Sequence, residues 1–344
     1  MNKPLLYIHI GAQKTGTSYI QEELLYHREK LINNGILYPL AGLHGSGHAA
    51  LATNFINPNH RKSLNSSNIF TVKSSVNRIR DDILFEINQS AQAIRSVIIS
   101  SEAFSLANIE NIRNLSSLFE DYFTIKIVYF LRKQDVLAES IRSQAYRVNQ
   151  ENFNPTRLIQ SFEEELNFNY ILKKWEAVFE LNNINIFEYR GINSLSNNAS
   201  KAFELPKIIN FRKRIVNKTL GRDLLEYIHF YTDIVYADGN YFECLDALAD
   251  VERNNPSSIK YKYFYSPETH ENIRKRYQAE NTEIELRYGI NNLFTTKTDA
   301  SMSSLWMPYK GLSETKRHFF NDVLKKFYPN SRARQTPKNR NYNI

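Results

Sequence analysis

The 344-residue sequence contains one cysteine and no long hydrophobic run. The lone Cys244 can neither form an internal disulfide nor supply a cysteine zinc cluster, so a reducing, cytoplasmic location is expected. The first apolar stretch, Leu5 to Ile10, is too short for a signal-peptide core. Because no run approaches the roughly 18 apolar residues of a spanning helix, membrane insertion is not expected either.

The sequence also lacks biased tracts and internal repeats. Hydrophobic residues make up 42% of the chain and aromatic residues 13%, with 11 glycines and 10 prolines. This composition excludes a disordered, collagen-like or coiled-coil protein. It provides enough apolar material for one large domain or two small ones.

The net charge of +8 is concentrated at the C-terminal end. Residues 310–344 carry nine Lys or Arg and only two Asp or Glu, whereas the rest of the chain is nearly neutral. A nucleic-acid footprint over the body of the protein is therefore not expected. We expect residues 328–344 to form a basic, flexible tail that either stays solvated or touches an anionic acceptor or membrane surface.

Apolar runs alternate with helical patterns through the first 190 residues. Strands are predicted at 4–10, 96–99, 124–131 and 185–189, and helices at 18–31, 76–92, 108–119, 136–148 and 168–181. Strands that alternate with helices predict an α/β fold, with a parallel β-sheet flanked by helices. In such a sheet, ligand-binding groups gather at the carboxyl ends of the strands.

The chain beyond residue 200 has a mainly helical pattern, with helices expected near 220–236, 240–253, 267–285 and 312–327. We interpret it as a largely helical C-terminal elaboration of the same domain. The expected organisation is a single domain of residues 1–327, with a core at about 4–190 and the elaboration at about 200–327.

A loop suited to a phosphate group follows the first predicted strand. It reads Gly11-Ala12-Gln13-Lys14-Thr15-Gly16-Thr17-Ser18 and precedes a helix, whose free N–H groups and positive end favour an anion. The glycine spacing is that of a P-loop, but Thr17 stands where a nucleotide-triphosphate loop has its lysine. Lys14, inside the loop, can instead place its ammonium beside the bridging oxygen of a leaving group, as sulfuryl transfer requires. The simpler alternative is a loop that merely caps the helix.

At these residues the chain resembles the sulfotransferase superfamily, whose loop reads approximately K-[TS]-G-T-[TS]. The resemblance implies a P-loop-like sulfotransferase fold that uses 3′-phosphoadenosine 5′-phosphosulfate (PAPS) as donor and releases PAP, with no metal. It assigns the 5′-phosphosulfate to Gly11, Lys14, Thr15, Gly16, Thr17 and Ser18. The family binds the 3′-phosphate with an arginine that ends a strand and a serine eight residues later. Arg132 and Ser140 match that spacing.

Transfer to a hydroxyl also needs a base, and two residues are candidates. Glu102 follows the strand SVIIS, where cytosolic relatives carry a Lys-Thr-His base motif; otherwise it caps the next helix or pairs with a basic residue. His48 lies in the loop AGLHGSGH, roughly where glycan-modifying relatives present a glutamate, and has a reference pKa near neutral. His44 is a weaker choice. We rank Glu102 ahead of His48.

The local sequences GAQKTGTSYIQ and NNGILYP are similar to those of the bacterial and carbohydrate branches of the superfamily. This similarity implies a glycan, glycolipid or other hydroxyl- or amine-bearing acceptor. One alternative is an enzyme of another class, a P-loop kinase or nucleotide hydrolase. The other is a protein without catalytic activity that binds PAP or a glycan. The kinase would need a lysine at Thr17 and an acidic residue ending a strand, neither of which is apparent.

Overall fold

The computed structural model describes residues 3–57, 75–147, 162–212, 220–232, 239–254, 263–294, 306 and 312–329. The chain divides into two compact units. Unit 1 consists of Met1–Lys133, Asn167–Val216 and Ala279–Phe294, and unit 2 of Gln134–Leu166, Asn217–Gln278 and Thr295–Ile344. The predicted basic tail lies outside the described residues from position 330 onward. The single domain expected over residues 1–327 stays a prediction.

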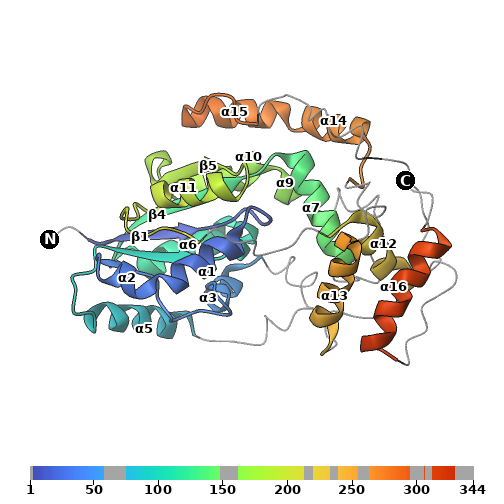
Figure 1. Ribbon diagram of the computed structural model, residues 1–344. Coiled ribbons are helices and arrows are strands. Elements are labelled where there is room, and N and C mark those ends of the chain that lie inside the picture. The colour runs from blue at the N-terminus through green and yellow to red at the C-terminus, as the bar shows by residue number, and fades with distance from the viewer. Residues whose placement is uncertain are drawn as a thin grey trace. The chain divides into compact units, whose positions relative to one another are not determined.

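Unit 1 contains a five-stranded sheet in which every neighbouring pair of strands is parallel. The strand order is β2-β3-β1-β4-β5, and β1, β4 and β5 run side by side in Figure 1. The strands are β1 (Leu5–His9), β2 (Ile36–Leu37), β3 (Ser96–Ser100), β4 (Thr124–Leu131) and β5 (Ile184–Glu188). The predicted α/β fold, a parallel sheet flanked by helices, is confirmed.

Helices cover both faces of this sheet. One face contributes Tyr7, Val128 and Phe130 to a core shared with α1 (Thr17–Tyr26), α2 (Arg28–Ile32) and α11 (Ile192–Ala202). On the other face Tyr129 meets Phe168 of α10 edge to face, with ring centroids 6.0 Å apart. Because side chains on a strand alternate between faces, both sets of β4 side chains are buried. The other elements of unit 1 are α3 (Ala49–Ala52), η1 (Thr53–Phe55), α5 (Val76–Asn88), η3 (Glu102–Leu106), α6 (Ile109–Phe119), α10 (Phe168–Glu176), η4 (Leu181–Asn183) and α15 (Gln278–Tyr288). Helix α15 belongs to unit 1 except for its first residue, Gln278.

The register of the central strands determines where the loops after them meet. His9, the last residue of β1, is opposite Ser100 of β3 and Val128 of β4. Because β4 continues to Leu131, the chain after β1 runs along its end, and the Ala12 amide donates to the Phe130 carbonyl over 2.8 Å. The segments that follow β1, β3 and β4 therefore lie at one edge of the sheet.

Helices are the only regular secondary structure among the described residues of unit 2. Its helices are α7 (Gln134–Arg147), α9 (Glu163–Leu166), α12 (Arg222–Tyr231), α13 (Tyr241–Asn254), α14 (Pro267–Arg276) and α16 (Glu314–Phe327). Aromatic rings form much of its core: Tyr146 stacks on His229 at 4.5 Å and meets Phe264 edge to face at 5.0 Å. The helical character predicted beyond residue 200 holds here, but α7, which was predicted to belong to the core, is part of this unit.

Candidate functional site

The loop between β1 and α1 contains three residues with a positive φ. Gly11, Lys14 and Gly16 all have positive φ, at 110°, 60° and 78°. The Thr15 hydroxyl, fully buried, donates to the Ala12 carbonyl over 2.6 Å and closes the loop on itself. A left-handed conformation is uncommon for a lysine, so the fold turns the backbone sharply at Lys14.

The N-terminus of α1 is open to an anion. Gly16 is the N-cap residue, no side chain caps the helix there, and the first turn contains no acidic residue. The first N–H groups of a helix lack partners within the helix and carry its positive dipole end. Since this 10-residue helix begins where the loop ends, Gly16, Thr17 and Ser18 lie where a phosphate is favoured.

Gly16 is required by packing as well as by its backbone conformation. A Cβ at this position would lie 2.5 Å from Cδ2 of Leu195 in α11 and 3.5 Å from Cε2 of Tyr189. Gly16 also has a φ that L side chains rarely adopt. The loop is therefore pressed against α11 and against the residue that follows β5.

Arg132 ends β4 beside this loop. Its Nη1 donates to the carbonyl oxygen of Lys14 over 2.5 Å, and its guanidinium lies 5.3 Å from the centroid of the Tyr189 ring. An arginine in this position supports the backbone at Lys14 and brings a positive charge to the loop. The structure thus brings Arg132 and Lys14 together in unit 1.

Ser140 lies on α7 in unit 2. Its hydroxyl donates to the Val136 carbonyl over 3.1 Å, a bond within the helix. Near it on the same helix, Oδ2 of Asp135 accepts from Arg274 over 2.6 Å and lies 3.3 Å from Nδ1 of His270. The pairing of Ser140 with Arg132 on one phosphate stays a prediction.

Glu102 lies against the first residue of the phosphate loop. A Cβ at Gly11 would be 3.4 Å from both Cα and Cβ of Glu102. Ser101, not Glu102, caps the η3 helix, because its hydroxyl accepts from the Ala103 amide over 3.3 Å. The partly buried Glu102 carboxylate instead accepts, at Oε2, a hydrogen bond of 3.3 Å from Nε2 of Gln21.

His48 has a structural role in the loop that contains it. The residue is fully buried, Nδ1 accepts from the Ser100 amide over 3.1 Å, and Nε2 lies 3.0 Å from the Pro39 carbonyl. Burial, opposed by these hydrogen bonds, lowers the pKa of His48 to about 4. A ring whose two nitrogens already bind the backbone is poorly placed to take a proton from an acceptor. His44, in contrast, is exposed.

The motif analysis missed two residues of this site, Gln21 and Tyr189. Tyr189 directly follows β5, so the rule that ligand-binding groups follow parallel strands could have identified it. Gln21 lies within α1 and has no sequence signal. Only the packing of α1 on the sheet brings it to Glu102.

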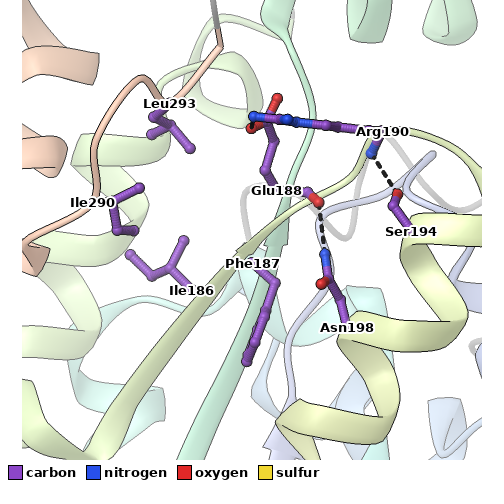
Figure 2. Close-up of a pocket in the computed structure, with 8 residues that line it drawn as sticks. All are labelled: Ile186, Phe187, Glu188, Arg190, Ser194, Asn198, Ile290 and Leu293. Carbon is purple, nitrogen blue, oxygen red and sulfur yellow. Dashed lines mark hydrogen bonds and ion pairs between the residues drawn. The ribbon is translucent and has the colours of Figure 1, made fainter.

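A separate pocket lies at the end of β5. Its volume is about 340 Å³, and its lining residues are Ile186, Phe187, Glu188, Arg190, Ser194, Asn198, Ile290 and Leu293. Figure 2 shows the Asn198 amide donating to the Glu188 carbonyl (2.9 Å) and the Arg190 amide donating to the Ser194 hydroxyl (3.0 Å). The Arg190 and Glu188 side chains form an ion pair of 2.6 Å. These bonds fix the segment that carries Tyr189.

Among the described residues, no group of three or more His, Cys, Asp or Glu side chains could hold a metal ion. Over the same part of the chain, no helix combines the length and the apolar character that a membrane crossing requires.

Comparison with known proteins gives solved structures but neither a matching family model nor a matching curated protein. A sulfotransferase from Alicyclobacillus acidocaldarius aligns at a TM-score of 0.42 and 14% identity, covering 63% of this chain and 87% of its own. The sulfotransferase domain of the curacin biosynthetic pathway aligns at 0.38 and 11%, covering 81% and 98%.

A third similar structure is retinol dehydratase in complex with androsterone and the inactive cofactor PAP. Its TM-score is 0.29 at 12% identity, and the alignment covers 100% of this chain and 84% of that one. At TM-scores below 0.5, the function has to be inferred from the site itself.

Proposed function

We propose that this protein is a PAPS-dependent sulfotransferase that moves a sulfonate group to an acceptor hydroxyl or amine, by direct in-line transfer. The observation that carries the proposal is the loop at Gly11–Ser18. Its lysine lies inside the turn, the uncapped N-terminus of α1 follows it, and Arg132 braces it from the neighbouring strand. A nucleotide-triphosphate loop would instead have its lysine at the position of Thr17.

The residues present fit a phosphosulfate donor. The start of α1 offers N–H groups without a side-chain cap, and Lys14 and Arg132 add two positive charges next to them. Such donors stabilise negative charge where it develops on a leaving group. PAPS supplies the activated sulfonate when bound. Lys14 would neutralise charge at the bridging oxygen, and Arg132 would hold both the loop and a second phosphate.

Glu102 is the residue we assign to the acceptor proton. A neutral alcohol is a poor nucleophile and becomes strongly acidic as its oxygen bonds to sulfur, so a carboxylate at the reacting centre takes up that proton. Glu102 lies against Gly11 at the start of the donor loop and is oriented by Gln21. We assign no proton transfer to His48, since both of its ring nitrogens bind the backbone.

The acceptor we propose is a carbohydrate or glycolipid, on the basis of sequence style, and the location we propose is cytoplasmic. Direct transfer can be tested by incubating the protein with PAPS labelled in its sulfonate and with bacterial polysaccharides, lipid-linked sugars and small phenols. Label is expected in a carbohydrate fraction, and Lys14→Ala should lower the rate of labelling by roughly two to three orders of magnitude. The exposed Lys30→Ala serves as the matched control.

The same experiment with Glu102→Gln tests the base. A general base contributes about 10²- to 10⁴-fold to the rate, so this variant should lose that much turnover while it still binds PAP. The exposed Glu110→Gln is its matched control. Absence of label in every acceptor, together with hydrolysis of ATP, would overturn the proposal in favour of a nucleotide hydrolase.

A further inference from the structure

Gln21 is a buried polar residue of α1 whose side chain faces the end of β3. Its Nε2 lies 3.3 Å from the Ser100 hydroxyl oxygen, 3.5 Å from the Ser100 carbonyl oxygen and 3.3 Å from Oε2 of Glu102. A carbonyl and a carboxylate can only accept hydrogen bonds. The amide nitrogen of Gln21, not its oxygen, therefore faces this cluster.

Gly47 packs directly against the Gln21 amide. A Cβ on Gly47 would lie 2.7 Å from Cδ, 2.7 Å from Oε1 and 2.8 Å from Nε2 of Gln21, so the loop backbone lies in close contact with the amide. Gly47 is itself fixed, because its carbonyl accepts from the His44 amide over 2.8 Å. In addition, the Tyr38 hydroxyl donates to the neighbouring Ser46 carbonyl over 2.7 Å.

Ser100 connects this amide to the interior of the sheet. Its hydroxyl oxygen lies 2.7 Å from Nδ1 of His9, and its amide and carbonyl bond to His48 over 3.1 and 2.8 Å. Both histidines are fully buried, and burial lowers the pKa of His9 to about 3. Glu102 is the carboxylic residue of this cluster, and the Gln21 side chain donates to its Oε2.

We propose that Gln21 is a positioning residue for Glu102. Its amide holds Oε2 against the end of β3 and leaves Oε1, which has no hydrogen bond within the described part of the chain, to receive the acceptor proton. The inference rests on the proposed function, in which Glu102 is the base. A hydrogen-bond donor favours the ionised form of a carboxylate that it contacts, so loss of the Gln21 donor should change the pH dependence of the reaction.

The test compares Gln21→Met, which keeps the length of the side chain but cannot donate, with the wild-type protein. We expect kcat to fall about 10- to 100-fold, since misplacing a reacting group by about 1 Å costs that much. The KM for PAPS and the Kd for PAP should stay unchanged. The acid limb of the kcat against pH profile should move to higher pH. Gln21→Glu, which places a second carboxylate beside Glu102, should move that limb further.

Asn54→Ala is the structural control, because its Nδ2 bonds to the Ala50 carbonyl over 2.9 Å, away from Glu102. It should lower Tm without moving the acid limb. A wild-type kcat and acid limb in both Gln21 variants, with Glu102→Gln inactive, would overturn the positioning role alone. Full turnover in Glu102→Gln, or no transfer by the wild-type protein, would overturn both the base and its positioning.

Discussion

The guanidinium of Arg132 donates a hydrogen bond to the carbonyl oxygen of Lys14 over 2.5 Å, although the two residues are 118 positions apart in the chain. This bond joins the end of β4 to the loop after β1. It gives Arg132 two tasks, since the side chain shapes the loop and also brings positive charge to it. The two tasks can be separated by substitution.

Arg132→Ala should weaken PAP binding about 10- to 100-fold, in keeping with roughly 1.5–3 kcal/mol for a hydrogen bond to a charged group. Arg132→Lys keeps the charge but loses the fork geometry, so its loss should be intermediate. Isothermal titration with PAP measures both. Arg78→Ala, which removes an exposed arginine paired with Asp82, is the control that should bind normally. Equal affinity in all four proteins would remove Arg132 from the site.

Gly16→Ala should destabilise unit 1 because its Cβ would lie 2.5 Å from Leu195 in a backbone conformation unfavourable to L residues. Gly45→Ala has a similar positive φ but no atom within 4 Å of the added Cβ, so it isolates the backbone cost of about 1–2 kcal/mol. Overpacking should add about 1–3 kcal/mol in Gly16→Ala. Urea denaturation measures the free energy of unfolding of both variants. Leu195→Ala, added to Gly16→Ala, should remove part of the destabilisation that overpacking causes. Equal losses in the two glycine variants would contradict the packing argument.

Lys14→Ala should lower turnover by roughly two to three orders of magnitude, as expected for the loss of one donor that stabilises developing charge. Its Tm should change little. The measurement is transfer of labelled sulfonate, with Lys30→Ala as control. Near-normal turnover in Lys14→Ala would show that the loop only caps α1.

The combined contribution of His9, His48 and His270 to folding stability should be largest near pH 6.5. Burial lowers the pKa values of His9 and His48 to about 3 and about 4, so below pH 6.5 these two residues bind more protons in the unfolded chain, and their contribution to stability falls as the pH falls. In unit 2, burial lowers the pKa of His270, but hydrogen bonds with Asp135 and Glu139 outweigh it and raise the pKa to about 8.

The contribution of His270 to folding stability is therefore fully present below pH 6.5 and is lost as the pH rises through about 8. Urea denaturation at pH 5, 6.5 and 9 measures the free energy of unfolding on the lower limb, below pH 6.5, and on the upper limb, above it. His270→Gln should flatten the upper limb and leave the lower one intact. A stability that rises from pH 6.5 to 9 would contradict these assignments.

Much of the fold could be predicted from the sequence because its central strands are continuous apolar runs. The run TIKIVYFL became β4 without a change of boundary, and SVIIS became β3. The helix expected over 18–31 is instead two helices, α1 and α2, separated at His27. Helix α11, with the sequence INSLSNNASKA, was missed because its many Asn and Ser residues are typical of loops, although its few apolar residues recur at helical spacing.

The site could be predicted only in part, because some of its residues follow strands and others meet only through packing. Gly11, Lys14, Gly16, Arg132 and Glu102 follow strands, so a rule about strand ends finds them. The bond from Arg132 to the Lys14 carbonyl and the contact of Gln21 with Glu102 depend on how β4 and α1 pack, which no local pattern encodes. The burial of His48 is likewise a tertiary effect, because its glycine-rich surroundings favoured an exposed loop.

The central claim is that the loop at Gly11–Ser18 binds a phosphosulfate donor. The most direct measurement is the thermal shift of the protein with PAP and, separately, with ATP and Mg²⁺, since a ligand that binds the native state raises Tm by mass action. PAP should raise Tm strongly, ATP with Mg²⁺ should raise it much less, and Arg132→Ala should reduce the shift with PAP. An equal response to ATP with no response to PAP would contradict the account.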